Sequence, residues 1–161
     1  MLENDMVDTC YKYFLSNSDD FEFIVREVPF LSRCIDLVLV TKDYKTVTIE
    51  FKIKNWREAL AQAKNHKLGA DKSYICLPEK SPSIKLLELL DKEQIGLYLY
   101  NPSAPCIIAE YYPAPDNAKK ISAFNDLLVR TTATIYENTC IDPFSKKNIG
   151  SASRSSRDAS K

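Results

Sequence analysis

Glu50 and Lys52 stand two residues apart in residues 46–53, where apolar and polar residues alternate. Successive side chains of a β-strand point to opposite faces of the sheet, so the alternation predicts a strand with both charged groups on one face. A carboxylate and an ammonium group placed in this way form either a surface ion pair or a metal ligand with a cation beside a phosphate. The spacing alone leaves both interpretations open.

Asp36 lies on the preceding predicted strand, at residues 34–40, and a short turn at residues 42–44 leads to the strand that carries Glu50. A turn of this length favours an antiparallel hairpin. If the hairpin turns about Asp43, Asp36 is opposite Glu50 and Leu37 is opposite Ile49 on the other, apolar face. A slip of one residue would separate the two carboxylates and mix the faces.

Two neighbouring carboxylates repel each other unless they share a proton or hold a cation. Mg²⁺ binds one or two carboxylates together with water and substrate phosphate oxygens, and Mn²⁺ accepts similar ligands. Asp36 and Glu50 are therefore predicted metal ligands, and Lys52 is predicted to neutralise charge at a scissile phosphate or to orient the attacking water. The competing interpretation is an ion pair between Glu50 and Lys52 on a solvated hairpin.

Periodicity and capping residues place these side chains in an α/β fold whose element order is α-β-β-β-α-β-α-β. Apolar periodicity predicts helices over 3–16, 55–68, 84–92 and 118–129, and strands over 21–29, 34–40, 45–54, 73–77, 95–100 and 106–111. Alternation of strand and helix after residue 54 implies right-handed crossovers onto a partly parallel sheet. The pattern predicts a mixed sheet flanked by helices.

The 161 residues suit one domain, expected over 1–144, followed by a basic, Ser-rich tail over 145–161 that is predicted to be disordered. The net charge is zero, which argues against electrostatic nucleic-acid binding by the whole chain, although residues 42–72 carry an excess of bases. Five scattered cysteines without metal-ligand spacing indicate a reduced, cytoplasmic protein. The sequence shows no apolar run that would span a membrane and no signal peptide.

Four segments together resemble the PD-(D/E)xK nuclease superfamily, which has the restriction-endonuclease-like fold and includes archaeal Holliday-junction resolvases. The segments are Ile-Asp-Leu-Val at 35–38, Ile-Glu-Phe-Lys at 49–52, the helix start at 55–63 and the strand at 71–78. The resemblance covers about residues 3–100 and implies an α-β-β-β-α-β core. The position before Asp36 holds Ile35 where the family pattern has Pro.

The resemblance implies a Mg²⁺- or Mn²⁺-dependent endonuclease that hydrolyses DNA phosphodiester bonds. Asp36 and Glu50 would then be metal ligands, Lys52 the catalytic lysine, and Gln62 a glutamine that supports the site. An acid of the first helix or the first strand would complete the ligand set. Glu3 is the first candidate, and Asp8 and then Glu27 are the alternatives.

The main alternative is a catalytically inactive module on the same scaffold that binds nucleic acid or a protein. Four basic residues of the segment after the motif strand are candidate phosphate contacts: Lys54, Arg57, Lys64 and Lys67. His66 is expected on the helix surface, and Trp56 is expected to anchor the start of that helix in the core. A homodimer is expected by analogy with small nucleases of this fold.

Overall fold

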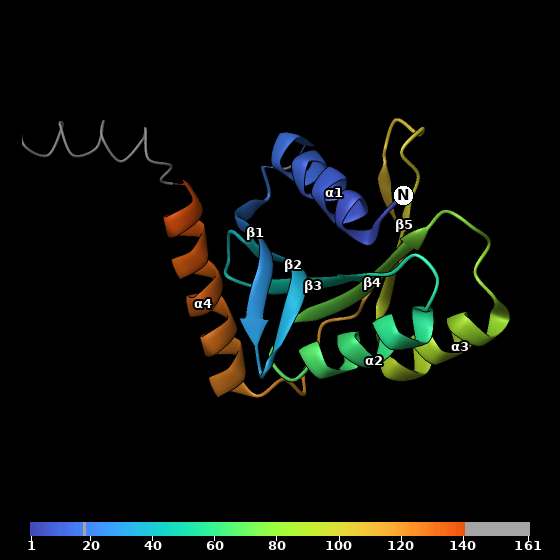
Figure 1. Ribbon diagram of the computed structural model, residues 1–161. Coiled ribbons are helices and arrows are strands. Elements are labelled where there is room, and N and C mark those ends of the chain that lie inside the picture. The colour runs from blue at the N-terminus through green and yellow to red at the C-terminus, as the bar shows by residue number, and fades with distance from the viewer. Residues whose placement is uncertain (18, 141–161) are drawn as a thin grey trace, which may run out of the picture.

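The computed structural model describes residues 1–17 and 19–140, and the predicted tail lies outside them. The fold contains a six-stranded sheet in the order β1-β2-β3-β4-β5-β6. Figure 1 shows helices on both faces of this sheet. The strands are β1 (Phe21–Phe30), β2 (Arg33–Thr41), β3 (Thr46–Phe51), β4 (Lys72–Pro78), β5 (Gly96–Tyr100) and β6 (Ile108–Tyr112). The helices are α1 (Glu3–Asn17), α2 (Trp56–His66), α3 (Ile84–Glu93) and α4 (Ser122–Cys140).

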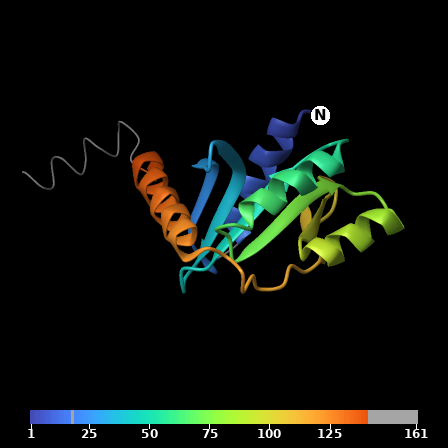
Figure 2. The ribbon, with the colours of Figure 1, turned by 90° about the horizontal axis from the view of Figure 1, so that it is seen from below.

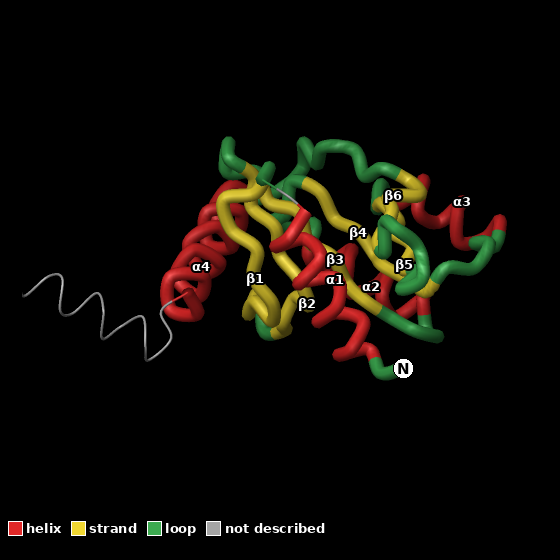
Figure 3. The backbone as a smooth tube through the Cα atoms, turned by 90° about the horizontal axis from the view of Figure 1, so that it is seen from above, coloured by secondary structure: helices red, strands yellow, loops and turns green. Residues whose placement is uncertain are grey.

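The sheet is mixed, as the sequence predicted. β1, β2 and β3 are antiparallel to one another, β3, β4 and β5 are parallel, and β6 is an antiparallel edge strand. Helix α1 covers one face, which Figure 3 shows from above, whereas α2 and α3 lie in front of the other face in Figure 2, which is seen from below. The α-β-β-β-α-β core of the restriction-endonuclease-like fold is thus confirmed, and the carboxyl ends of the three parallel strands share one edge of the sheet.

The β2–β3 hairpin has the predicted register. Leu37 pairs with Ile49 and Leu39 pairs with Val47. These apolar side chains are fully or almost fully buried in a cluster with α1. The alternation along β3 therefore sends its other side chains towards the face that carries α2.

Capping residues start α2 and α3 where the sequence predicted. The side chain of Asn55 accepts a hydrogen bond from the Glu58 amide (3.2 Å), and the side chain of Ser83 accepts one from Leu86 (3.1 Å). In the middle of α2, the carbonyl of Ala63 accepts a hydrogen bond from the Ser73 hydroxyl of β4 (2.8 Å). The small residues of α2 allow this close approach, which fixes the helix against the sheet.

Helix α4 differs from its prediction, since it spans Ser122–Cys140 rather than 118–129. The β-branched residues after position 129 have low helix propensity, so the helix was predicted to end at residue 129. Packing outweighs that propensity: Leu128 is buried against β1 and β2, and the ring centroids of Tyr136 and Phe23 are 5.0 Å apart. No helix of residues 1–17 and 19–140 is long and apolar enough to cross a membrane.

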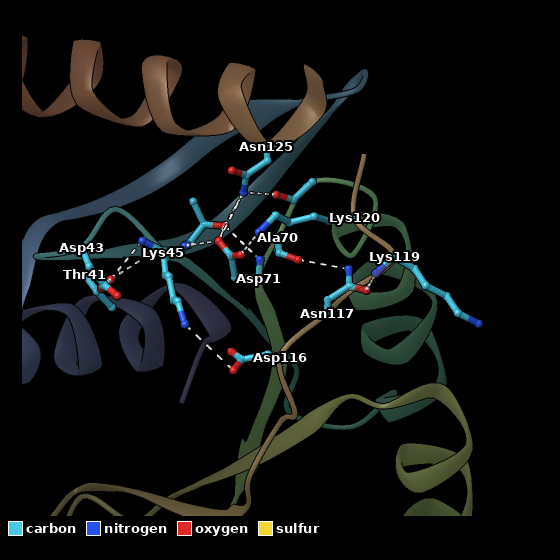
Figure 4. Close-up of polar contacts among 12 residues, drawn as sticks. Thr41, Asp43, Lys45, Ala70, Asp71, Asp116, Asn117, Lys119, Lys120 and Asn125 are labelled. Carbon is cyan, nitrogen blue, oxygen red and sulfur yellow. Dashed lines mark hydrogen bonds and ion pairs between the residues drawn. The ribbon is translucent and has the colours of Figure 1, made fainter. Parts of the chain in front are cut away.

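A buried carboxylate, Asp71, joins the amino ends of β3 and β4 to α4 (Figure 4). Its Oδ2 accepts hydrogen bonds from the Thr46 amide (2.8 Å) and from Asn125 of α4 (3.3 Å), and its Oδ1 pairs with Lys120. Asn125 also donates to the carbonyl of Gly69 (2.7 Å). This network lies at the end of β3 opposite to Glu50, so it holds the scaffold and not the candidate site.

Replacing Asp71 with Ala is expected to lower the free energy of unfolding by about 1–3 kcal/mol, because the Thr46 amide would stay buried without its acceptor. Urea denaturation measures the change. The matched control is Asp116→Ala, since Asp116 is exposed and only contacts Lys45 at 4.0 Å. We expect less than about 0.5 kcal/mol for the control; equal effects of the two variants would contradict the role of Asp71.

Candidate functional site

Asp36 and Glu50 lie side by side at the point where β2 and β3 separate. The last paired residues of the ladder are Leu37 and Ile49, one position before the two carboxylates. The amide of Phe51 donates instead to Oδ2 of Asp36 at 2.9 Å, so a carboxylate takes the place of the next backbone acceptor. Asp36 is half-buried, and Glu50 is only 2% exposed. We call these two residues the carboxyl pair.

Burial and mutual repulsion disfavour the form of the carboxyl pair in which both groups are ionised. Burial and the charge of Asp36 raise the pKa of Glu50 to about 8. Burial also raises the pKa of Asp36, whereas the Phe51 amide and the charge of Lys52 act in the opposite direction. Glu50 therefore holds a proton at neutral pH, and its Oε2 has no hydrogen-bond partner among the described residues. A shared proton or a bound cation would relieve the repulsion within this pair.

Lys52 lies one residue beyond the end of β3, where two carboxylates contact its ammonium group. Nζ is 3.3 Å from Oε1 of Glu3 and 3.5 Å from Oε1 of Glu58. Burial alone would lower the pKa of Lys52, but these two acids raise it. Lys52 is thus a fixed cation next to the carboxyl pair.

Among the three acids considered for the third ligand, Glu3 is the one that contacts Lys52. Its Oε2 also accepts a hydrogen bond from the Ile53 amide (3.2 Å), which anchors the start of α1 at the end of β3. Asp8 instead pairs with Arg26 (3.0 Å) and Lys12 (2.8 Å). Glu27 is exposed on β1 and has a φ of 54°. The geometry therefore favours Glu3 over the other two.

Helix α2 contributes Gln62 and His66, one turn apart and close to β3. The expected surface position of His66 is wrong: its side chain is 1% exposed, and its Nδ1 is 3.7 Å from Oε2 of Glu50. Burial and the charge of Arg33 lower the pKa of His66 to about 4, so the ring is neutral. Oε1 of Gln62 and both ring nitrogens of His66 are buried, with no partner among the described residues.

Glu58 is the site residue that the sequence reasoning missed. It was considered only as part of the helix start, a role that its hydrogen bonds with Asn55 also fulfil. The signal for it was its spacing, because residues 58, 62 and 66 recur every four positions and so share one face of α2. That face is turned towards the carboxyl pair and Lys52.

The four predicted phosphate contacts separate into two groups. Lys64 pairs with the Glu93 carboxylate of α3 (3.4 Å), and Lys67 donates to the Glu93 carbonyl (2.7 Å). Lys54 is exposed beside Lys52, and the Arg57 guanidinium lies 4.2 Å from the ring centroid of Trp56. Lys64 and Lys67 thus contact α3, and Lys54 and Arg57 lie at the start of α2.

No group of three or more His, Cys, Asp or Glu residues in the described part of the chain has the spacing of a metal site. The carboxyl pair by itself offers two oxygen ligands, with a buried unpaired oxygen on Glu50. Mg²⁺ often binds with one or two carboxylates and takes its other ligands from water and phosphate. The residues present therefore fit a hard divalent cation whose coordination is completed by a substrate.

No family model matches the sequence, and no curated protein matches it significantly. Among solved structures, the chain is similar to SPO1766, a protein of unknown function from Silicibacter pomeroyi, with a TM-score of 0.64 and 18% identity over 88% of this chain and 90% of that one. At this identity the likeness shows the fold alone.

Two further solved structures are similar over a smaller region. A repair endonuclease from Pyrococcus abyssi has a TM-score of 0.48 and 23% identity, and covers 63% of this chain and 48% of its own. EndoMS in a complex with double-stranded DNA has a TM-score of 0.44 and 19% identity, and covers 59% of this chain and 44% of its own. With TM-scores this low, neither likeness carries an inference about activity. The likeness to SPO1766 therefore shows a shared fold and nothing further.

Proposed function

We propose that the protein is a divalent-metal-dependent nuclease that hydrolyses phosphodiester bonds of DNA. The observation that carries the proposal is the carboxyl pair, which sits in register at the end of β3 with Lys52 two residues further on. A structural ion pair between Glu50 and Lys52 would need neither Asp36 opposite Glu50 nor a buried, unpaired carboxylate oxygen. The partners of Lys52 are in fact Glu3 and Glu58.

Asp36 and Glu50 would hold Mg²⁺ or Mn²⁺ through their carboxylate oxygens, and Glu3 is the nearest further acid. The bound ion would supply Lewis acidity and lower the pKa of a bound water. Lys52 would place its positive charge beside the phosphate, and Glu3 and Glu58 would hold the ammonium group in position. Gln62 would orient a water or a phosphate oxygen with its amide, since Oε1 has no protein partner in residues 1–17 and 19–140.

The alternative function is a catalytically inactive module that binds DNA or a protein with the same scaffold. The two carboxylates that engage Lys52 favour this alternative, because they neutralise the charge that a phosphate would need. Homodimer formation stays a prediction in either case.

The test is incubation of the purified protein with single-stranded, double-stranded and branched DNA in the presence of Mg²⁺ or Mn²⁺. We expect cleavage of at least one substrate that stops when EDTA is added. Titration calorimetry with Mn²⁺ separates the two functions, since a nuclease should bind the ion through Asp36 and cut DNA. Absence of cleavage with every substrate and both ions would contradict the nuclease.

A further inference from the structure

Three hollows lie next to one another along the edge of the sheet that carries the candidate site. The first has a volume of about 530 Å³ and lies between the starts of α2 and α3. The middle one, of about 460 Å³, contains Glu3, Lys52 and Glu58. The third, of about 540 Å³, lies between α2 and the turn from β1 to β2. Ile53 and Lys54 line both the first and the middle hollow, and Glu58 lines both the middle and the third.

Unpaired cations lie at both ends of this series. Lys54 and Lys80 line the first hollow and Arg33 lines the third. All three are exposed, and none has an ion-pair partner among the described residues. The ammonium group of Lys52 in the middle hollow is engaged by Glu3 and Glu58. A polyanion that crosses the site would therefore meet free cations on both sides of Lys52.

The first hollow also contains a flat aromatic surface. Trp56 lines it and is half-buried, together with Pro82 and Leu99. The guanidinium of Arg57 lies over this ring, 4.2 Å from its centroid, in a cation–π contact. Aromatic side chains stack on unpaired bases of any sequence, whereas bases inside a duplex already stack on each other. The start of α3, capped by Ser83, borders the same hollow and adds partial positive charge.

We propose that the three hollows form a track for one unpaired DNA strand, in which a base stacks on Trp56 and phosphates contact Lys54, Lys80 and Arg33. The strand crosses Lys52 in the middle hollow, so the track places a phosphate beside the ammonium group of Lys52, two residues along the chain from Glu50. This inference rests on the proposed nuclease and specifies its substrate as single-stranded DNA or an unpaired segment. Trp56 packs against the core, as expected for an anchor at the start of the helix. In the track, the same ring also stacks on a base.

Trp56 is the one tryptophan in the sequence, so intrinsic fluorescence reports on it directly. In EDTA, where no cleavage occurs, oligothymidylate is expected to quench this fluorescence with a saturable curve. The duplex of oligothymidylate with oligodeoxyadenylate should bind more weakly and quench less at the same salt concentration. Oligothymidylate binding without quenching, or equal affinity for the duplex, would overturn the track.

Variants are compared through the anisotropy of a labelled oligothymidylate. Trp56→Ala should weaken binding by about 5- to 150-fold, the range for loss of one stacked base. Lys80→Glu and Arg33→Glu should each weaken binding and reduce the slope of log K against log salt by about 0.7. Both side chains are exposed, so these variants test the track even if Trp56→Ala fails to fold. The matched control is Lys92→Glu on the last turn of α3, which should bind like the parent. A control that weakens binding as much as Lys80→Glu would also overturn the track.

The binding assay and the cleavage assay fail independently. If oligothymidylate quenches Trp56 but no DNA is cut with Mg²⁺ or Mn²⁺, the track stands and the nuclease is wrong. If DNA is cut while Trp56→Ala, Lys80→Glu and Arg33→Glu all bind and cut like the parent, the nuclease stands and the track is wrong.

Discussion

Asp36→Asn is expected to reduce Mn²⁺-dependent DNA cleavage by more than about 100-fold, because loss of a ligand should cost more than loss of an outer-shell partner. The substitution keeps an oxygen that can accept the hydrogen bond of the Phe51 amide, so the hairpin should stay intact. Lys52→Met is expected to lower cleavage by about 100- to 1,000-fold, the usual effect of removing a group that stabilises transition-state charge. Single-turnover cleavage of a labelled DNA measures both effects.

The two variants should differ in metal binding. Asp36→Asn should weaken Mn²⁺ binding in titration calorimetry, whereas Lys52→Met should retain it, since the ammonium group is not a ligand. Matched controls are Asp126→Asn, an exposed acid of α4, and Lys92→Met, an exposed lysine on the last turn of α3. Parent-like cleavage by both site variants would show that the nuclease activity does not depend on the carboxyl pair and Lys52.

Glu50→Gln is expected to stabilise the protein at high pH by up to a few kcal/mol in the absence of divalent cations. The pKa of Glu50 rises from 4.5 to about 8 on folding, so the folded state binds the proton more tightly. This contribution to stability is fully present below pH 4.5 and is lost as the pH rises through 8. A glutamine resembles the protonated acid and does not titrate, so the variant should match the parent near pH 4, exceed it increasingly from about pH 4.5 to 8, and keep a constant advantage above pH 8.

His66 also affects how the free energy of unfolding depends on pH. Its pKa falls from 6.5 to about 4 on folding, so its contribution is present above pH 6.5 and is lost as the pH falls towards 4. Between pH 4.5 and 6.5 the two contributions have opposite slopes and cancel. In His66→Gln, the loss of stability caused by Glu50 should therefore extend down to about pH 4.5.

Urea denaturation from pH 4 to 9, in EDTA, measures these differences between each variant and the parent. Glu88→Gln, on the exposed face of α3, is the control for replacing a glutamate by glutamine away from the carboxyl pair. A constant offset between Glu50→Gln and the parent at all pH values would mean that folding does not raise the pKa of Glu50, contrary to its buried position beside Asp36.

The parts of the fold that local patterns specify were predictable. Alternation and a short turn set the β2–β3 register, and with it the position of Asp36 opposite Glu50. The caps Asn55 and Ser83 marked the starts of α2 and α3. Each of these features depends on residues that are close in the sequence, so each leaves a pattern that can be interpreted without the structure.

Contacts between distant segments left no such pattern. The acid that contacts Lys52 could not be chosen among Glu3, Asp8 and Glu27, because the choice depends on where α1 begins relative to the end of β3. His66 was misplaced, because the sequence does not reveal which face of α2 is turned towards β3. The length of α4 was underestimated, because packing on β1 outweighs the low helix propensity of its second half.

The sequence by itself determined the element order, the hairpin register and the pairing of two carboxylates next to a lysine. Only the tertiary structure placed Glu3 and Glu58 on Lys52, buried His66 against Glu50, and joined three hollows across the site. The physical reason is the distance along the sequence between the residues that interact. Register and caps follow from hydrogen bonds between chain neighbours, whereas burial and charge at Glu50 depend on how α1 and α2 dock on opposite faces of the sheet.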